Sequence, residues 1–135
     1  MLKVKIITPQ REILSRDVES VTCNTIDGEI TILPRHTALL TLLSEGVIKV
    51  KDKDKEEYFS AGSGYIETDG REIHILISRA AGQGELDERK ILEVEAEAKR
   101  LLGEHRDESE RKKAFAMLKR STIDLKVIKK LKRIS

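Results

Sequence analysis

Asp27, Glu29 and His36 are the residues whose types and spacing come nearest to acid–base chemistry in this sequence. They share the stretch "DGEITILPRHTALL", residues 27–40. A histidine acting as general base needs a group that orients it and a pocket that tunes its pKa. One hypothesis is therefore a small hydrolase centred on His36. The other is that this stretch only shapes a contact surface, and the absence of a G-x-S-x-G nucleophile elbow favours it.

Other catalytic and binding chemistries find little support in the sequence. The three histidines are scattered at positions 36, 74 and 105, and Cys23 is the only cysteine, so neither a zinc site nor an internal disulfide is expected. The glycine segments "AGSG" and "AGQG" lack the Lys-Ser/Thr pair that completes a phosphate-binding loop. We expect no metal and no catalytic residue.

Composition indicates a folded chain with a strongly ionised surface. Of the 135 residues, 39% are hydrophobic, 37% are charged and only 3% are aromatic, which leaves few rings for stacking on nucleic-acid bases. The amino terminus lacks the apolar core and cleavage site of a signal peptide. The longest uncharged stretch, "HTALLTLLS", is far shorter than the roughly 20 residues of a membrane-spanning helix.

The first part of the chain has the pattern of an antiparallel β-sandwich with about ten short strands. Apolar and polar residues alternate in short β-branched runs that Gly, Asp or Pro interrupt every 8 to 12 residues or so. His74 lies in the last run, "REIHILIS", and is interpreted as a residue on one face of a strand. The other clear runs are "LKVKIIT", "DVESVTC", "EITIL", "GVIKVK", "EEYFSA" and "GYIET".

The second part is predicted to be an antiparallel two-helix hairpin, so we expect a β-sandwich domain at 1–84 and a helical domain at 85–135. Gly103 is the expected C-cap of the first helix, and Asp107 or Ser109 the N-cap of the second. Apolar residues recur at spacings of three and four in both helices. The predicted stripes are Ile91, Val94, Ala98 and Leu101 in the first helix, and Ala114, Phe115, Leu118, Leu125, Ile128 and Leu131 in the second.

Charge differs sharply between the two predicted helices. Residues 85–109 carry nine acidic and five basic residues, whereas residues 110–135 carry ten basic and two acidic residues, for a net charge of +8. This excess predicts an acidic partner. A basic-helix nucleic-acid-binding module is the alternative, although Phe115 is the helix's one aromatic residue.

Four segments in order resemble the epsilon subunit of bacterial and plastid F-type ATP synthases. They are "VKIITPQREILSRDVESV", "DGEITILPRHTALLTLL", "SGYIETDGREIHILISRA" and the helical start "LDERK". Thr31 and Arg35 stand where this family usually has Gly, and Ala38 where it often has Pro. A bulky residue suits those positions only where the backbone is not left-handed, so a loop of different shape is expected.

The resemblance implies a non-catalytic rotor subunit of a proton- or sodium-translocating synthase, at the cytoplasmic face of the bacterial membrane or at the plastid thylakoid. It implies that the sandwich binds the gamma subunit and that the helices inhibit ATP hydrolysis by contacting an acidic segment of the beta subunit. The implied residues are Glu29, Arg35 and His36 at the membrane c-ring, and Arg120, Lys126, Lys129 and Lys130 at beta.

Some relatives bind ATP through an (Ile/Leu)-Asp-x-x-Arg-Ala motif, which the stretch "LDERKI" matches in part. Leu86 and Asp87 agree with the motif, but Lys90 replaces Arg and Ile91 replaces Ala. Lysine keeps the positive charge and loses the planar fork that grips phosphate. The resemblance therefore implies at most weak ATP binding at the hairpin, and the competing role of Asp87 is to cap the helix.

Overall fold

The computed structural model describes residues 1–104 and 106–134, and of residues 131–134 it describes only the backbone. The chain divides into two compact units, Met1–Gly82 and Gln83–Ser135. The sequence places this division two residues later. The difference arises because Gln83–Glu85 forms a short 3-10 turn, η1, which belongs to the second unit.

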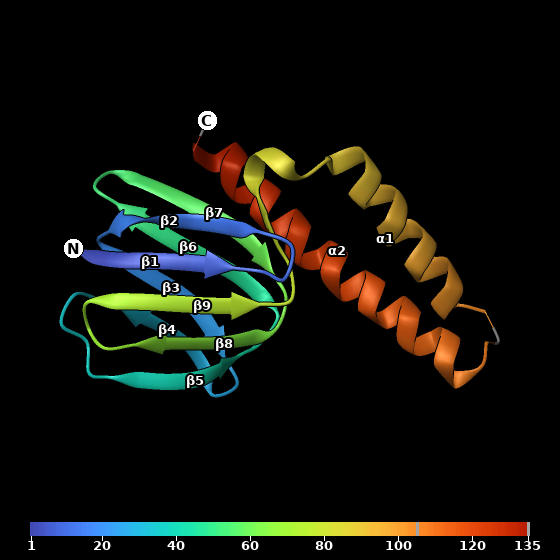
Figure 1. Ribbon diagram of the computed structural model, residues 1–135. Coiled ribbons are helices and arrows are strands. Elements are labelled where there is room, and N and C mark those ends of the chain that lie inside the picture. The colour runs from blue at the N-terminus through green and yellow to red at the C-terminus, as the bar shows by residue number, and fades with distance from the viewer. Residues whose placement is uncertain (105, 135) are drawn as a thin grey trace. The chain divides into compact units, whose positions relative to one another are not determined.

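The first unit is a ten-stranded sheet that folds into two layers, as predicted (Figure 1). Its strand order is β10-β7-β6-β3-β5-β8-β9-β1-β2, and β4 pairs with β3 beside this path. All pairs are antiparallel except β1 and β9, which run parallel. The strands are β1 (Leu2–Ile7), β2 (Glu12–Val18), β3 (Ser20–Thr25), β4 (Gly28–Ile32), β5 (Leu39–Leu43), β6 (Gly46–Asp52), β7 (Lys55–Ala61), β8 (Gly64–Thr68), β9 (Glu72–Ile77) and β10 (Ala80–Gly82).

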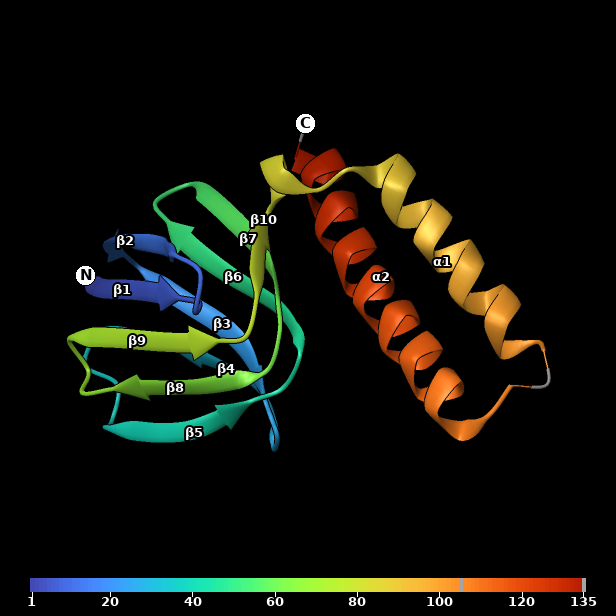
Figure 2. The same ribbon diagram turned by 45° about the vertical axis from the view of Figure 1, so that its right-hand side comes forward.

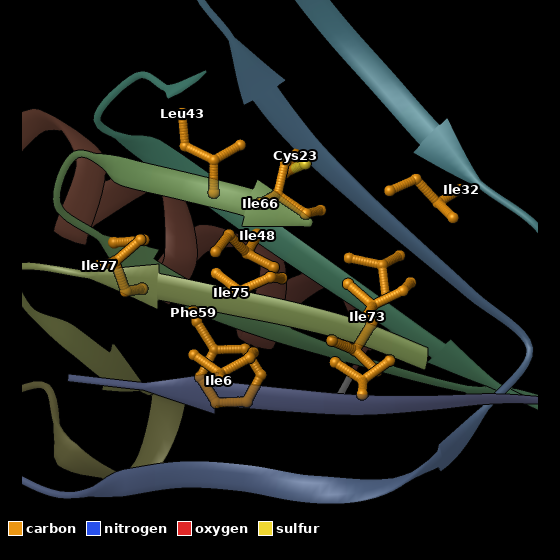
Figure 3. Close-up of a cluster of buried hydrophobic side chains, with 14 of the residues drawn as sticks. Ile6, Cys23, Ile32, Leu43, Ile48, Phe59, Ile66, Ile73, Ile75 and Ile77 are labelled. Carbon is orange, nitrogen blue, oxygen red and sulfur yellow. The ribbon is translucent and has the colours of Figure 1, made fainter. Parts of the chain in front are cut away.

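The core of this unit is formed by the apolar residues that alternate with polar ones along the strands. In β9, Ile73, Ile75 and Ile77 are buried, whereas the residues between them point to the other face, as a side-chain period of two requires. The buried side chains of both layers meet in a single apolar cluster (Figure 3). Burying each of these large aliphatic side chains stabilises the fold by about 1.5–3 kcal/mol.

The second unit is an antiparallel pair of helices, α1 (Glu88–Leu102) and α2 (Glu108–Ile134), which Figure 2 shows side by side. Asp87 caps α1 by accepting a hydrogen bond from the backbone amide of Lys90 at 3.3 Å. Gly103 ends α1, with a right-handed φ of −80°. Of the two candidates for the second N-cap, Asp107 is the one used, since its carboxylate accepts from the amide of Glu110 at 2.8 Å.

The apolar stripes of the hairpin are only partly as predicted. Ala98 and Ala114 are fully buried, but the side chain of Phe115 is 56% exposed and Val94 is 41% exposed. Phe115 follows Ala114 directly and is therefore turned about 100° away from the buried stripe. Leu131, the last predicted member of the stripe, lies outside the residues whose side chains are described.

Candidate functional site

The loop that carries Arg35 and His36 connects β4 to β5 at one end of the sandwich. The backbone amide of His36 donates to the carbonyl of Leu33 at 3.1 Å and closes a turn around Pro34. Arg35 has a φ of 68°, which lies in the left-handed region. The expectation that a bulky residue excludes this backbone conformation is wrong at Arg35. It is not contradicted at Thr31, which belongs to β4 and has no positive φ.

The turn between β8 and β9 contacts this loop. The amide of Arg35 donates to the carbonyl of Gly70 at 2.9 Å, and Gly70 lies in the β8–β9 turn with a φ of +93°. A Cβ atom on Gly70 would stand 2.6 Å from the carbonyl oxygen of His36. Only glycine therefore fits under the loop at this position. Two segments 35 residues apart in sequence thus form one corner of the sandwich.

The three residues assigned to the c-ring by resemblance do not come together. Glu29 is the second residue of β4, whereas Arg35 and His36 follow the other end of that strand. Because a strand rises about 3.3 Å per residue, Glu29 and His36 lie at opposite ends of β4. The nearby acid Asp27 lies on the Glu29 side, in the β3–β4 turn.

The hydrolase hypothesis requires a carboxylate that orients His36, and Asp27 and Glu29 lie at the other end of β4. His36 Nδ1 lies 2.6 Å from the carbonyl oxygen of Thr37, and among the described residues His36 forms no ion pair with an acidic side chain. Nor does that part of the chain contain a cluster of three or more His, Cys, Asp and Glu residues able to hold a metal ion.

An apolar row crosses the outer face of four neighbouring strands. Leu42 of β5 pairs with Tyr65 of β8, Tyr65 pairs with Leu76 of β9, and Leu76 pairs with Ile7 of β1. Leu42 is 56% exposed and Tyr65 is 40% exposed, while Leu76 and Ile7 are half-buried. We call these four residues the apolar row.

Two further exposed side chains extend this surface. Leu40 lies two residues before Leu42 on the same face of β5, and the amide of Ile26 donates to the carbonyl of Leu42 at 3.3 Å. Both side chains are more than 60% exposed. Contiguous exposed apolar surface of this kind marks interaction sites in soluble proteins. The sequence shows only that these residues are apolar, because their pairing across four strands depends on the register of the sheet.

The next row on the same face is polar and contains His74. Its register partners are Glu67 on β8 and Lys5 on β1, and its Nε2 lies 3.5 Å from a carboxylate oxygen of Glu72. The prediction that His74 is a residue on one face of a strand is confirmed.

The residues of the partial ATP motif lie at the start of α1. The carboxylate of Asp87 serves as the helix cap described above, Lys90 is exposed and Leu86 is half-buried. The capping role predicted for Asp87 is therefore confirmed. ATP binding by Leu86, Asp87 and Lys90 stays a prediction.

The basic residues of the two helices differ in their surroundings. In α1, Arg89, Lys99 and Arg100 each form an ion pair with a glutamate three or four residues away. In α2, Arg120, Lys126 and Lys129 are exposed, and within the described part of the chain none of these three forms an ion pair. Lys130, the fourth residue assigned to the beta contact, is half-buried.

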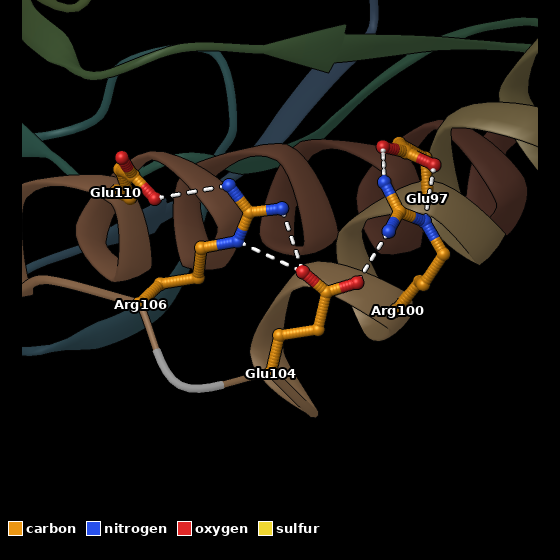
Figure 4. Close-up of polar contacts among 5 residues, drawn as sticks. All are labelled: Glu97, Arg100, Glu104, Arg106 and Glu110. Carbon is orange, nitrogen blue, oxygen red and sulfur yellow. Dashed lines mark hydrogen bonds and ion pairs between the residues drawn. The ribbon is translucent and has the colours of Figure 1, made fainter.

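A chain of charged residues connects the end of α1 to the start of α2 (Figure 4). Arg100 pairs with Glu97 and Glu104, and Arg106 donates to Glu104 at 2.6 Å and to Glu110 at 3.3 Å. These contacts raise the pKa of both arginines and lower the pKa of Glu97 and Glu104. Acidic residues of the hairpin thus pair with the arginines that connect its two helices, whereas Arg120, Lys126 and Lys129 of α2 form no ion pair with a described residue.

Hydropathy gives no sign of a membrane-spanning helix. In the part of the chain that the structure describes, neither helix combines the length and the apolar character that crossing a bilayer requires.

Comparison with known proteins gives consistent matches along the chain. Residues 1–83 match the family model described as "ATP synthase, Delta/Epsilon chain, beta-sandwich domain". The chain is 30% identical over 132 residues to the ATP synthase epsilon chain of Psychrobacter cryohalolentis, which covers 97% of this chain and 96% of the relative. It is 36% identical over 108 residues to the epsilon chain of Wolinella succinogenes, covering 79% and 82%.

The fold also has a counterpart among solved structures. A chain in the Euglena gracilis mitochondrial ATP synthase, from a structure of OSCP, F1 and c-ring, superposes with a TM-score of 0.70. The match covers 98% of this chain and 80% of that chain at 20% sequence identity. At this identity the likeness supports the fold.

Proposed function

The chain belongs to the epsilon-chain family of ATP synthases, and on this premise we propose that it is a non-catalytic rotor subunit that connects gamma to the membrane c-ring and restrains ATP hydrolysis. The observation that carries the proposal is the apolar row, Ile7, Leu42, Tyr65 and Leu76, on the outer face of the sandwich. A monomeric protein gains nothing from exposing this surface, whereas a subunit docked on gamma buries it. The assembly would lie at the cytoplasmic face of a bacterial membrane or at the thylakoid and move protons or sodium ions.

Binding to gamma tests this role directly. Leu42→Lys combined with Tyr65→Lys places two charges in the middle of the proposed contact. Central aromatic and apolar contacts of an interface contribute more than about 1 kcal/mol each, so we expect gamma to bind at least roughly tenfold more weakly. The matched control is Leu92→Lys, which changes a leucine on α1 whose exposure, 46%, lies between those of Leu42 and Tyr65. Unchanged affinity in the double variant, with an intact fold, would contradict the proposal.

The contact with the c-ring is proposed to involve the polar ends of β4. Since Glu29 lies near the start of β4 and His36 lies in the loop after its end, the two positions are tested separately. Single cysteines at the two positions, carrying a photoreactive label in the assembled synthase, should yield a cross-link to the ring from at least one position. No cross-link to the ring from either position would remove this part of the proposal.

Inhibition is proposed to come from α2. Arg120, Lys126 and Lys129 are exposed and are proposed to contact an acidic segment of the beta subunit, and the half-buried Lys130 is the fourth residue that the resemblance assigns to this contact. Attraction between several charges at partly desolvated sites can add up to a few kcal/mol, enough to shift a two-state equilibrium by tens-fold or more. Weak ATP binding at Leu86, Asp87 and Lys90 would be a further influence on the same hairpin.

The hydrolysis rate of the catalytic head tests the inhibitory part. Replacing Arg120, Lys126 and Lys129 together by Gln should relieve inhibition, as should deletion of residues 85–135, while gamma binding persists. The matched control replaces Arg89, Lys99 and Arg100 by Gln, because these three cations are already ion-paired in α1. Full inhibition by both the triple variant and the truncated chain would overturn this part.

A further inference from the structure

Phe115 and Leu92 are exposed apolar side chains on the same face of the helical hairpin. Phe115 follows Ala114, a buried residue of α2, and is turned about 100° from it. Leu92 lies six residues before Ala98, the buried residue of α1, which is a turn of about 120° in the same sense. Because the two helices are antiparallel and pack on each other, similar turns away from their buried residues lead to one face of the pair.

Leu92 lines a shallow hollow on this face of α1. The other lining residues are Ala96, Glu88, Arg89 and Glu93, so the floor of the hollow is apolar and its rim carries an excess of negative charge. Arg89 and Glu93 form an ion pair at 3.8 Å, but both side chains are strongly exposed and solvent screens their attraction. The hollow therefore suits an apolar side chain that has positive charge beside it.

Phe115 has the properties that this hollow requires. Lys112 precedes the ring by three residues and Lys119 follows it by four, and side chains at these spacings are neighbours on a helix surface. Both lysines are exposed, and Lys112 lies 4.0 Å from Glu108 in a pair that is exposed on both sides. The ring is therefore an apolar projection between two positive charges. It matches the hollow on α1 in polarity and in sign of charge.

We propose that two copies of this chain associate through their hairpins, with Phe115 of each copy in the hollow at Leu92 of the other. Since the projection and the hollow lie on one face of the same hairpin, a two-fold axis allows both contacts to form at once. The four helices together then bury apolar side chains that a single hairpin exposes to water. This self-association goes beyond the proposed rotor function, because it concerns the chain outside the rotor.

Sedimentation equilibrium of the full chain tests for the dimer in the absence of any other subunit. The interface is small, so we expect a dissociation constant between about 1 μM and 1 mM. Phe115→Ser removes the projection and Leu92→Lys places a positive charge in the hollow, and each should raise this constant at least about tenfold. The matched control is Val94→Ser, which changes an exposed residue on roughly the opposite side of α1 and should leave the dimer unchanged. Circular dichroism checks that each variant keeps its helices.

Mixing two charge-reversed chains tests the reciprocal contact. One chain carries Lys112→Glu and Lys119→Glu, so its projection and its hollow are both negative. The other carries Glu88→Lys and Glu93→Lys, so both features are positive. Each chain alone should dimerise more weakly than the unchanged chain, because like charges then meet in both contacts. The mixture should form a heterodimer, since opposite charges meet again at both contacts, and about 1 M salt should abolish this preference.

An unchanged chain that stays monomeric up to about 1 mM would overturn the self-association. A dimer that Phe115→Ser and Val94→Ser weaken equally, or a mixture of folded charge-reversed chains without heterodimer, would overturn the contact between Phe115 and the hollow. A monomeric chain whose Leu92→Cys, carrying a photoreactive label, cross-links to another subunit in the assembled rotor would assign the hollow to that subunit instead. None of the sedimentation results depends on gamma, so a failure of the proposed function is seen separately in the gamma-binding assay.

Discussion

Arg16 Nη2 lies 2.5 Å from Glu57 Oε1 and connects β2 to β7 across 41 residues of sequence. β2 is the last strand of the sheet order, and β7 is next to the strand at its other end. The ion pair therefore shows that the sheet curls until its two ends approach each other. This closure lets one face of all the strands contribute to a single buried core.

A double-mutant cycle with Arg16→Gln and Glu57→Gln measures the contribution of this ion pair to the free energy of unfolding. The two side chains are 41% and 38% exposed, so solvent screens them and we expect a coupling energy of about 0.2–1 kcal/mol. At about 1 M salt the coupling should disappear. Urea unfolding gives the free energies, and Glu67→Gln, on a strand away from the closure, is the control. A coupling that survives high salt would mean that packing, and not charge, joins the two strands.

Arg35→Gly should leave the sandwich at least as stable as before, although it removes a long side chain. A left-handed backbone costs a non-glycine residue about 1–2 kcal/mol, and glycine removes this cost. Glycine also makes the unfolded chain more flexible, which destabilises the folded state by about 0.4–1 kcal/mol. The expected net change is a stabilisation of up to about 1 kcal/mol in thermal or urea unfolding.

Thr31→Gly is the matched control for this change, since both positions usually hold glycine in the family that the sequence resembles. Thr31 lies within β4, and its hydroxyl is 2.9 Å from that of Thr22. Glycine within a strand costs about 0.5–1 kcal/mol. Destabilisation by Arg35→Gly to the same extent as by Thr31→Gly would contradict the strain assigned to position 35.

The fold could be predicted where local pattern and burial agree. β9 alternates strictly and was expected, whereas β2, β5 and β10 were not among the seven clear runs. β2 begins opposite an irregularity in register at Ile6 and Ile7, and β10 has only three residues. In β5, "LLTLL", Leu40 and Leu42 face solvent, which a string of apolar letters does not indicate.

In the candidate site too, the local features could be predicted from the sequence and the long-range contacts could not. The Asp87 cap is a local feature, because the cap and the amide it accepts from are three residues apart, and it was predicted. The corner depends on contact between Arg35 and Gly70, and the apolar row on the register of four strands. Such long-range pairings are set by the packing of the whole sandwich. The signal available in the sequence for the corner was Arg35, which stands where the related family usually has glycine.

The stability of the sandwich should decrease at high pH because of Cys23. Burial, with a smaller contribution from the Glu29 carboxylate, raises the pKa of this thiol to about 12. In the unfolded chain the thiol ionises near its usual value, so the folded state holds the proton more tightly. This contribution is complete below pH ~8.5 and is lost as the pH rises toward 12, at up to about 1.4 kcal/mol per pH unit.

Urea unfolding between pH 8 and pH 11 measures this loss, and Cys23→Ala removes it while leaving the other titrating groups unchanged. The same burial predicts that a maleimide at pH 8 modifies Cys23 only after unfolding. Rapid labelling of the native chain, or identical pH dependence in both proteins, would contradict the buried neutral thiol.

Asp87 allows the capping and the nucleotide-binding roles to be separated. Asp87→Ser keeps a side-chain oxygen for the amide of Lys90 and removes the charge, whereas Asp87→Ala removes both. We expect Asp87→Ala to destabilise the hairpin by about 1 kcal/mol and Asp87→Ser to change it by much less. Circular dichroism at the helix band during thermal unfolding measures the difference. ATP titration of the same variants then tests whether the Asp87 carboxylate also contributes to nucleotide binding. Stabilisation by ATP that persists in Asp87→Ser cannot depend on that carboxylate.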